Sequence, residues 1–366
     1  MMTKENKIRV LIVDDSLTAR NLLKLILSED PQFEIVGIVS DGVEAVAFVE
    51  RERPDVISMD IHMPVMNGFE ATRQIMANNP VPIVIVSIAY NPSETQLSFK
   101  ALEAGALTIL PRPIGPGHPN FLKHGKSYRS TLKSLSEVRV IRRNRGEFKP
   151  PENTQSDLKK TDSKRYEEEN HISSNIVVIG ASAGGPAALQ IIMKSIPPDF
   201  PFPVLIVQHI DKGFAEGFAQ WLGQASTIPV SIPRDGDRLF PGHAYLPSGD
   251  HHLGVKQGRV IAMSSSSPEQ GLRPSVNFLF RTAGAVYGKN TIALLLSGMG
   301  NDGAKELKNL KDMGAFTIVQ NEETSLVYGM PGEAIRLHAS CSVLPPERMI
   351  QAIINQFNLL MKHQSI

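Results

Sequence analysis

The chain has 366 residues, with 38 lysines and arginines against 37 aspartates and glutamates and a formal net charge of +1 at pH 7. This balance gives no reason to expect nucleic acid or an acidic membrane surface as a partner, and the single cysteine excludes an intramolecular disulfide. No segment approaches the roughly 18 consecutive apolar residues of a membrane span. We therefore expect a cytoplasmic protein that does not insert into the membrane, and the length predicts two domains.

The first part of the chain is predicted to form one α/β domain. Residues 8–110 alternate between short β-branched runs (IRVLIV, FEIVGIV, DVISM, PIVIVS and LTIL) and segments with helical spacing. Strands that alternate with helices predict a parallel sheet covered by helices on both faces. Helical spacing from Tyr128 to Ile141 adds a closing helix, so the first domain is expected to span residues 6–143.

A linker and a second α/β domain follow. Residues 144–173 are highly charged, poor in apolar residues and contain a Pro-Pro pair. Such a segment cannot bury enough surface to offset the entropy of ordering, so we expect a flexible linker that lets the two domains dock or separate. Residues 174–360 resume the alternation, with a more irregular middle, and predict a second parallel sheet.

Three acidic residues stand at the carboxyl ends of apolar runs in the first domain, namely Asp14 and Asp15 after VLIV and Asp60 after VISM. These ends meet at one crevice of a parallel sheet, where three carboxylates repel one another unless a cation lies between them, and oxygen ligands suit Mg²⁺. The hydroxyl of Ser87 and the cation of Arg112 follow two further strands. The set predicts a site that holds a phosphorylated aspartate. The alternative is that the acids only favour a helix start or a turn.

The order of these residues, with DIHMPVMNG beginning at Asp60, resembles the response-regulator receiver family, which implies a flavodoxin-like fold. The resemblance also implies that a histidine kinase is the phosphodonor for Asp60, that Asp14, Asp15 and Asp60 bind Mg²⁺, and that Ser87 and Arg112 form the phospho-switch. Arg112 is a departure, because the family has a lysine there. It keeps the charge in a larger planar group.

The stretch IVVIGASAGGPAAL, residues 176–189, runs from a strand through glycines into a helix. A dinucleotide-binding fingerprint needs glycine at its third position, which here is Ser182. The string fits G-x-S-x-G instead, a sharp strand-to-helix turn that exposes a serine hydroxyl. The free N–H groups at the start of the helix could stabilise an oxyanion or bind a phosphate, so this stretch alone leaves an anion-binding loop open.

Two other strand ends supply partners for Ser182. PVLIVQ ends at His209, which would lie near Ser182 if the two strands are parallel neighbours. TIALLLSGMGNDG places Asp302 in a loop that opens a helix, where it could orient the imidazole or only cap the helix. The chain order Ser, His, Asp differs from that of the α/β-hydrolases and predicts a different strand arrangement.

Other histidines and aspartates compete for these roles. His243, His251, His252, Asp235 and Asp237 lie in the irregular middle of the second domain. The adjacent His251 and His252 suggest a metal, but no further ligands recur at a zinc-like spacing. We expect these residues at the rim of the pocket or in structural roles.

The segments IGASAGGP, IVQHI, GFAEGFAQWL, DGDRLFPGHAYLPSGDHHL, RPSVNFLF, LLSGMGNDGA and VYGMPGEAI resemble, in this order, the catalytic domain of the chemotaxis protein-glutamate methylesterase (CheB) family. The resemblance implies hydrolysis of glutamate γ-methyl esters on methyl-accepting chemoreceptors, deamidation of certain receptor glutamines, and hence sensory adaptation. It implies that Ser182 attacks the acyl carbon, His209 takes its proton and Asp302 holds His209, with no cofactor for the esterase reaction.

The resemblance also locates the oxyanion hole and two departures. Backbone N–H groups of Ala183, Met299 and Gly300 are the candidates for binding the oxyanion. Ala183 replaces a threonine that is usual in the family, and Leu272 replaces a frequent histidine, but neither change removes a member of the triad.

These expectations amount to two doubly wound parallel-sheet α/β domains, a flavodoxin-like receiver and a Rossmann-like esterase, joined by a flexible linker. In the family the unphosphorylated receiver covers the active site, so phosphorylation of Asp60 is expected to raise esterase activity. The alternative is a signalling adaptor whose second domain binds a partner without hydrolysis, and Ser182, His209 and Asp302 argue against it. A nucleotide-binding effector domain is disfavoured by the serine in the glycine turn. Nothing in the sequence requires more than a monomer.

Overall fold

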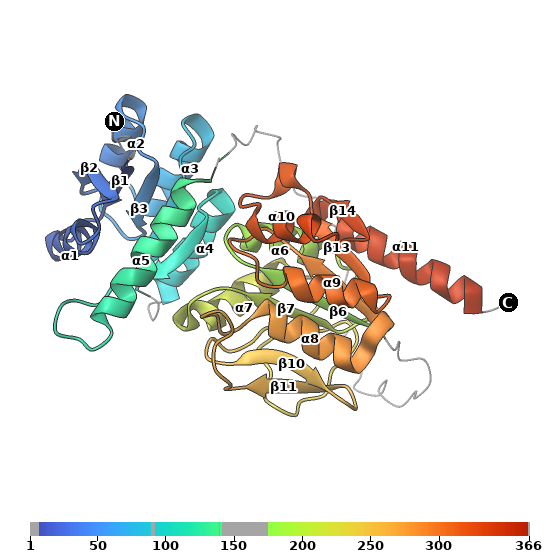
Figure 1. The fold of residues 1–366 in the computed structure, drawn as a ribbon. Helices are drawn as coiled ribbons and strands as arrows, with labels where there is room; N and C mark the ends of the chain where they lie inside the picture. The colour runs from blue at the N-terminus through green and yellow to red at the C-terminus, as the bar shows by residue number, and fades with distance from the viewer. Residues whose placement is uncertain (1–6, 89–91, 139, 141–174, 365–366) are drawn as a thin grey trace, which may run out of the picture.

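The computed structural model describes residues 7–88, 92–138, 140 and 175–364. Figure 1 shows two α/β domains side by side, the N-terminal one coloured blue to green and the C-terminal one green to red. The predicted linker, residues 144–173, lies outside the described residues. No helix within the described ranges combines the length and the apolar character needed to cross a membrane.

The N-terminal domain is a five-stranded parallel sheet in the order β2-β1-β3-β4-β5, the flavodoxin-like order that the sequence predicts. Helices α1 and α5 cover one face, and α2, α3 and α4 cover the other. The central strands β3 and β4 are buried along their whole length, as strands covered on both faces are expected to be. The elements are β1 (Ile8–Val13), α1 (Leu17–Ser28), β2 (Phe33–Val39), α2 (Gly42–Arg51), β3 (Val56–Asp60), α3 (Gly68–Asn78), β4 (Ile83–Ser87), α4 (Pro92–Ala104), β5 (Thr108–Pro111) and α5 (Phe121–Ser136).

The C-terminal domain has a seven-stranded parallel sheet in the order β14-β13-β12-β6-β7-β9-β8. Helices α6, α7 and α11 pack on one face, and α8, α9 and α10 on the other. The main elements are β6 (Ile176–Ala181), α6 (Gly185–Ser195), β7 (Val204–Gln208), α7 (Ala215–Ala225), β8 (Val230–Ser231), β9 (Ala244–Tyr245), β10 (His252–Lys256), β11 (Val260–Ser264), α8 (Val276–Tyr287), β12 (Thr291–Leu295), α9 (Ala304–Asp312), β13 (Phe316–Gln320), α10 (Gly329–Arg336), β14 (Ser342–Leu344) and α11 (Pro346–Gln364). Short 3-10 helices are η1 (Lys212–Phe214), η2 (Gly288–Asn290) and η3 (Glu322–Thr324).

The strand order creates a crevice at the carboxyl ends of β6, β7 and β12. From β6 the chain continues on one side to β7, and it later returns to the other side of β6 as β12. Ligands of open parallel sheets bind where the order reverses in this way. The doubly wound fold expected for this domain is therefore present, and it brings three strand ends together.

The antiparallel hairpin of β10 and β11 departs from the expected all-parallel arrangement. Gly254 interrupts the β-branched pattern in β10, so the sequence signal for a strand is weak there. A Cβ at this position would lie 2.6 Å from the Thr282 hydroxyl and 2.9 Å from the Phe278 ring. The glycine is needed because α8 packs directly on the hairpin.

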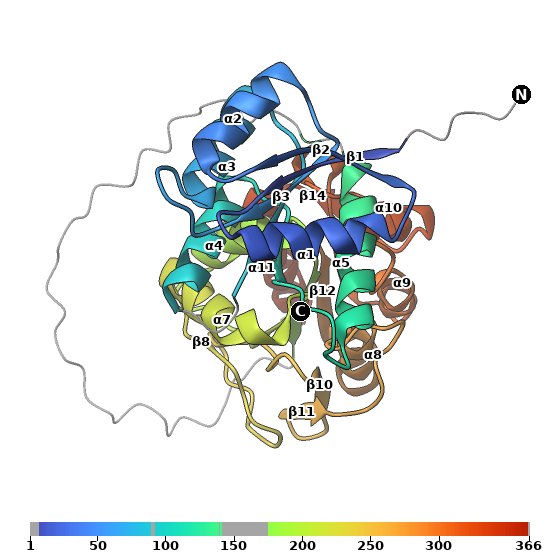
Figure 2. The ribbon, with the colours of Figure 1, turned by 90° about the vertical axis from the view of Figure 1, so that its left-hand side faces the viewer.

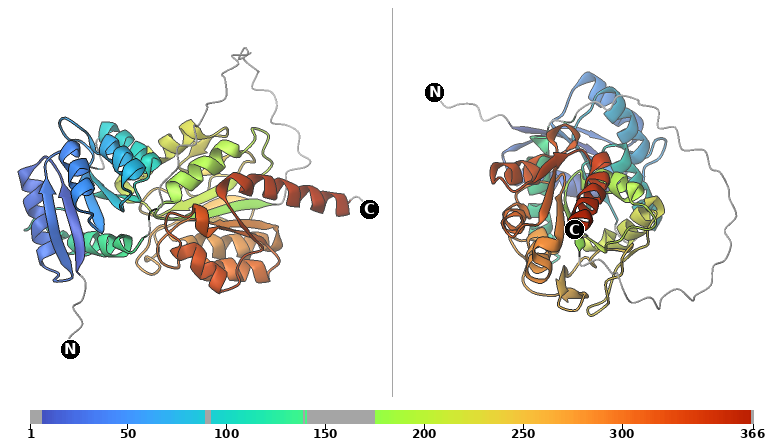
Figure 3. Two further views of the ribbon diagram at one scale, coloured as in Figure 1. Left: turned by 90° about the horizontal axis from the view of Figure 1, so that it is seen from above. Right: turned by 90° about the vertical axis from the view of Figure 1, so that its right-hand side faces the viewer.

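The two domains contact each other through α4 of the first and α6 and α7 of the second, as the views in Figures 1, 2 and 3 show. The Phe99 ring lies 5.7 Å from the Phe218 ring and 5.6 Å from the Trp221 ring. Glu103 accepts hydrogen bonds from Trp221 Nε1 at 2.8 Å and from Gln190 Nε2 at 2.7 Å. The apolar core of one domain is thus continuous with that of the other.

Candidate functional site

The structure brings the predicted acidic residues of the N-terminal domain together. Asp14 and Asp15 follow β1, and Asp60 ends β3, the next strand in the sheet. Each of the three has a carboxylate oxygen within 4.8 Å of those of the other two, and Asp14 and Asp60 are buried. Such a set of oxygen donors fits a hard divalent cation such as Mg²⁺.

Arg112 supplies positive charge to the same cluster. Its Nη2 lies 2.9 Å from Asp60 Oδ2 and 3.2 Å from Asp14 Oδ2. Burial raises the pKa of Asp60 to about 7, with the Asp14 charge acting in the same direction and Arg112 opposing both. Burial likewise raises the pKa of Asp14. The positive charge of one guanidinium does not fully balance the negative charge of the two buried carboxylates. The remaining negative charge favours binding of a further cation.

The remaining predicted residue of this cluster lies at the end of β4. Ser87 is fully buried, and its carbonyl accepts from the Arg112 N–H at 3.0 Å, so the two strand ends are tied together. The last residue of DIHMPVMNG, Gly68, must be a glycine for steric reasons, because a Cβ there would lie 2.1 Å from the carbonyl oxygen of Asp60. The motif thus lets α3 begin directly against the candidate phosphoacceptor.

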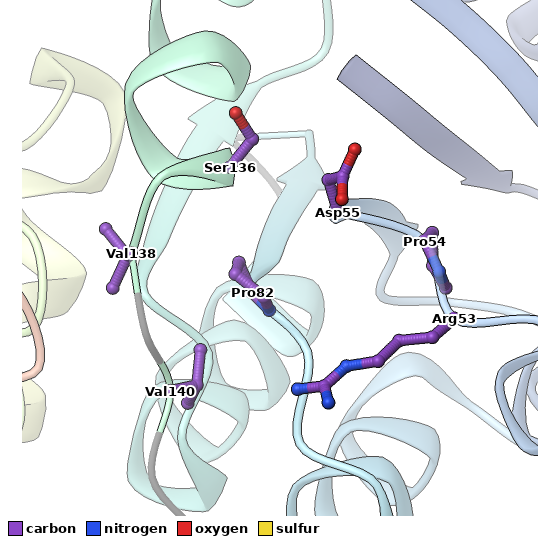
Figure 4. A pocket seen from close by; sticks show the side chains of 7 residues that line it. All are labelled: Arg53, Pro54, Asp55, Pro82, Ser136, Val138 and Val140. Atoms are coloured by element: carbon purple, nitrogen blue, oxygen red, sulfur yellow. The ribbon is translucent and has the colours of Figure 1, made fainter. Parts of the chain in front are cut away.

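A cavity of about 570 Å³ lies at the opposite edge of this sheet. Figure 4 shows its lining, which includes Pro54 and Asp55 before β3, Pro82 before β4, and Val138 after α5. These are the amino ends of the strands, whereas the acidic cluster lies at the carboxyl ends. The cavity is therefore separate from the candidate site.

In the C-terminal domain, Ser182 lies in a sharp turn between β6 and α6. Its N–H donates to the Ser297 carbonyl at 3.0 Å, and its own carbonyl accepts from the Gly185 N–H at 2.8 Å. Gly184 has φ 74°, a left-handed conformation that favours glycine. A Cβ at Gly298 would lie 2.8 Å from the Ser182 Cβ, so this second glycine makes room for the serine.

His209 and Asp302 meet above the end of β6. His209 follows β7, Asp302 lies in the loop after β12, and His209 Nε2 is 2.9 Å from Asp302 Oδ2. The His209 N–H also donates to the Ala181 carbonyl at 2.9 Å, which places the imidazole beside the turn that carries Ser182. Nε2 is occupied by Asp302, so Nδ1 is the ring nitrogen left to accept a proton from the serine. The described residues contain no hydrogen bond between the Ser182 hydroxyl and His209, and such contacts often tighten only when substrate binds.

The Asp302 carboxylate is held by the first residues of α8. Oδ1 accepts from the Ser275 hydroxyl at 3.0 Å and from the Asn277 N–H at 2.9 Å, and Oδ2 accepts from the Val276 N–H at 2.7 Å. Burial alone would raise the pKa of Asp302, but His209 and these N–H groups outweigh it and hold the pKa below its usual value. Asp302 is thus kept ionised, as a group that stabilises an imidazolium must be.

Asp302 can therefore cap a helix and orient His209 at the same time. The helix that it caps is α8, whereas the helix that follows its own loop is α9.

His252 also supports this arrangement, and it is fully buried. Its Nδ1 accepts from the Ser275 N–H at 3.2 Å, so its Nε2 carries the hydrogen and lies 3.3 Å from the Ser267 carbonyl. His252 fixes the start of α8, a role that its sequence position did not reveal.

Of the predicted oxyanion donors, Ala183 directly follows Ser182, and Met299 and Gly300 directly follow Gly298, which packs against the Ser182 side chain. Among the described residues, the N–H groups of Ala183, Met299 and Gly300 have no hydrogen-bond acceptor. The Ala183 carbonyl accepts from the Ser297 hydroxyl at 2.8 Å, which fixes the peptide beside the nucleophile. Met299 and Gly300 are exposed in the loop between β12 and α9.

The other histidines and aspartates considered for catalysis have partners outside the triad. His243 pairs with the Ser231 hydroxyl at 2.9 Å, and His251 pairs with the Ser248 hydroxyl at 3.1 Å. Asp235 forms an ion pair with Lys256 at 2.9 Å, and Asp237 accepts from the Arg234 N–H at 2.7 Å. None of these hydrogen bonds or ion pairs involves Ser182, His209 or Asp302. Leu272 exchanges backbone hydrogen bonds with Glu269, shortly before α8.

Comparison with known proteins covers both domains. Residues 177–353 match the family described as CheB methylesterase, and residues 10–118 match the response regulator receiver domain. The chain is 47% identical over 347 residues to the protein-glutamate methylesterase/protein-glutamine glutaminase 4 of Geobacter metallireducens, covering 94% of this chain and 98% of that protein. It is 45% identical over 352 residues to the protein-glutamate methylesterase/protein-glutamine glutaminase of Nitrosospira multiformis, covering 95% and 96% respectively.

Among solved structures, the CheB methylesterase catalytic domain of Thermotoga maritima is 36% identical with a TM-score of 0.48, covering 50% of this chain and 98% of that one. The response regulator domain of Thermotoga maritima CheB is 34% identical with a TM-score of 0.33, covering 36% and 98%. With 47% identity to a relative across nearly its whole length, this chain belongs to the CheB methylesterase family and carries a response regulator receiver domain in front of its esterase domain.

Proposed function

We propose that this chain hydrolyses glutamate γ-methyl esters on methyl-accepting chemoreceptors, and deamidates certain receptor glutamines, with Ser182, His209 and Asp302 as the catalytic residues. The observation that carries the proposal is the 2.9 Å pair of His209 and Asp302 beside the turn that presents Ser182. The names of the relatives, which pair methylesterase with glutaminase, support an enzyme rather than an inactive adaptor.

In this proposal the three side chains carry out an acyl transfer. His209 Nδ1 takes the proton of Ser182 as its Oγ attacks the ester carbonyl carbon, and Asp302 stabilises the imidazolium that forms. The N–H groups of Ala183, Met299 and Gly300 stabilise the oxyanion. His209 then returns the proton to the departing methoxide, methanol leaves, and a water activated by His209 hydrolyses the acyl-enzyme. An amide substrate follows the same path and releases ammonia.

The N-terminal domain controls this reaction through Asp60, which a histidine kinase phosphorylates in our proposal. Asp14, Asp15 and Asp60 would hold Mg²⁺, which neutralises negative charge on the phosphoryl group during transfer. Arg112 already lies 2.9 Å from Asp60, and Ser87 ends the neighbouring strand. Both residues could therefore contact a phosphoryl group on Asp60. The esterase reaction itself uses no cofactor in this proposal.

The docked arrangement of the domains supports inhibition by the unphosphorylated receiver. The Gly184 N–H, two residues after the nucleophile, donates to the Leu107 carbonyl of the receiver at 2.8 Å. Ala183 and Val327 are buried in one apolar cluster with Leu107. The residues that directly follow the nucleophile are therefore held against the receiver while the domains are docked. A hundredfold inhibition needs only about 2.7 kcal/mol of docking free energy. A cavity of about 450 Å³ lies between α4 and α7 in the same interface.

The proposed setting follows from the partners. We propose a cytoplasmic monomer, because the kinase and the methylated segments of the receptor act there and the site is complete within one chain. All three residues of the triad come from the C-terminal domain.

Replacing the nucleophile tests the proposed function. Ser182→Ala should abolish methanol release from a methylated receptor, measured with the full chain and a phosphodonor, because no other hydroxyl occupies the turn. Ser195→Ala, at the far end of α6, removes a hydroxyl that donates to the Ile192 carbonyl and should leave the rate unchanged. Equal release by wild type and Ser182→Ala would contradict the assignment.

Removing the charge of Asp302 should slow the same reaction. Asp302→Asn presents an NH₂ group either to His209 or to the N–H groups of α8, and we expect kcat to fall by about 10³- to 10⁴-fold. Ser275→Ala removes one donor to the carboxylate but keeps its charge, so its rate should stay within about tenfold of wild type. If both variants lost activity equally, Asp302 would have only a structural role.

Metal removal separates control from catalysis. Chelation of divalent cations should abolish the stimulation of esterase activity by a phosphodonor and leave the basal activity unchanged, because only the receiver uses Mg²⁺. Asp60→Asn should show the same loss of stimulation in the presence of Mg²⁺. A variant that responds to the phosphodonor as wild type does would exclude Asp60 as the acceptor.

Weakening the domain interface should mimic activation. Trp221→Phe keeps a ring against Phe99 but removes the N–H donated to Glu103, a loss of about 1 kcal/mol. Basal methanol release should rise roughly fivefold, with no change in the fully phosphorylated rate. Tyr287→Phe, on α8, serves as the control and should leave basal release unchanged. Unchanged basal release in Trp221→Phe would argue against inhibition through this interface.

A further inference from the structure

One buried side chain beside the triad has no part in the reaction described above. Gln208 is the last residue of β7, directly before His209, and is only 4% exposed. Its amide nitrogen donates to the Ser182 carbonyl at 2.9 Å and to the His209 carbonyl at 3.0 Å. A single amide group thus contacts the main chain of the nucleophile and of the base.

The partners fix the orientation of this amide. Carbonyl oxygens only accept hydrogen bonds, so both hydrogens of the NH₂ group point at them. The amide oxygen then faces the first turn of α6, because a Cβ at Gly185 would lie 2.5 Å from Gln208 Oε1. The amino-terminal end of a helix carries partial positive charge, which favours an oxygen there.

The Gln208 side-chain amide lies where the backbone hydrogen bonds between β6 and β7 end. Strands β6 and β7 are paired as far as Ala181 and Gln208, and the His209 N–H still donates to the Ala181 carbonyl at 2.9 Å. Beyond this point Ser182 turns toward α6, and the described residues include no backbone hydrogen bond between Ser182 and His209. The side chain of Gln208 supplies the link that the ladder no longer provides.

We propose that Gln208 is a positioning residue for the esterase reaction, fixing the separation between the Ser182 hydroxyl and the His209 imidazole by binding both main-chain carbonyls. The inference rests on the proposed function of Ser182 and His209. Proton transfer needs the two groups within hydrogen-bond reach, and a displacement of about 1 Å can cost about a hundredfold in rate. Gln208 is buried and its amide nitrogen binds main-chain carbonyls, so we expect its loss to affect kcat rather than KM.

The first test is Gln208→Met, which preserves the volume of the side chain but cannot donate. With the full chain and a phosphodonor, kcat for methanol release from a methylated receptor should fall by about 10- to 100-fold while KM stays within about twofold. The control is Thr317→Val in β13, which removes a buried hydroxyl that donates to the Ala339 carbonyl at 2.7 Å and accepts from the Cys341 N–H at 3.0 Å. It loses buried hydrogen bonds that involve no residue of the triad and should keep the wild-type kcat. A kcat for Gln208→Met within about twofold of wild type would overturn the proposal, as would an equal loss in both variants.

The second test is Gln208→Glu. If Gln208 had only a structural role, this variant and Gln208→Met would behave alike. A carboxylate cannot donate to either carbonyl and brings negative charge beside His209. The limb of the kcat/KM pH profile that reports the base should therefore move to higher pH. A profile that is lowered but not moved would contradict the inference. If wild type releases methanol, Ser182→Ala does not, and Gln208→Met matches wild type, then this inference alone fails; no release by wild type would instead reject the proposed function.

Discussion

The start of α8 holds the Asp302 carboxylate through two backbone N–H groups and the Ser275 hydroxyl, and the position of the His209 imidazole depends on it. Burying an ionised carboxylate is costly unless it is paired and hydrogen-bonded. Here the helix supplies the donors, and buried His252 fixes the helix start in turn. The base is therefore oriented by a chain of contacts that belongs to the fold rather than to a mobile loop.

Both domains use the carboxyl edge of a parallel sheet, but for different chemistry. In the receiver, three carboxylates and Arg112 converge there, and the site is suited to a cation and a phosphoryl group. In the esterase, the edge presents a hydroxyl, an imidazole and one carboxylate, with free N–H groups around them. The same strand geometry thus serves charge binding in one domain and nucleophilic attack in the other.

Much of this arrangement could be predicted from the sequence, because the site residues lie at or after the ends of apolar runs. Asp60 ends its strand, Ser182 and His209 directly follow theirs, and Asp302 lies in the loop after β12; parallel strands bring such ends together. The contributions of Gln208 and His252 could not be predicted, since one lies within a strand and the other begins a hairpin with a weak pattern. Their roles depend on which elements become neighbours in space, as the packing of α8 on the hairpin at Gly254 illustrates.

The link between the two sites lies in the segment from the end of β4 to the end of β5. Ser87 and Arg112 flank this segment and lie near Asp60, whereas Leu107 and Glu103, within it, contact the esterase domain. In the proposed control, a phosphoryl group on Asp60 engages Ser87 and Arg112 and shifts β5, which directly precedes Arg112. The Leu107 carbonyl accepts from the Gly184 N–H, and Leu107 packs in one apolar cluster with Ala183, so a shift of β5 would weaken the contact with the turn that carries the nucleophile. A charge added to Asp60 in the receiver would then act, through this contact, on the turn that carries Ser182 in the esterase domain.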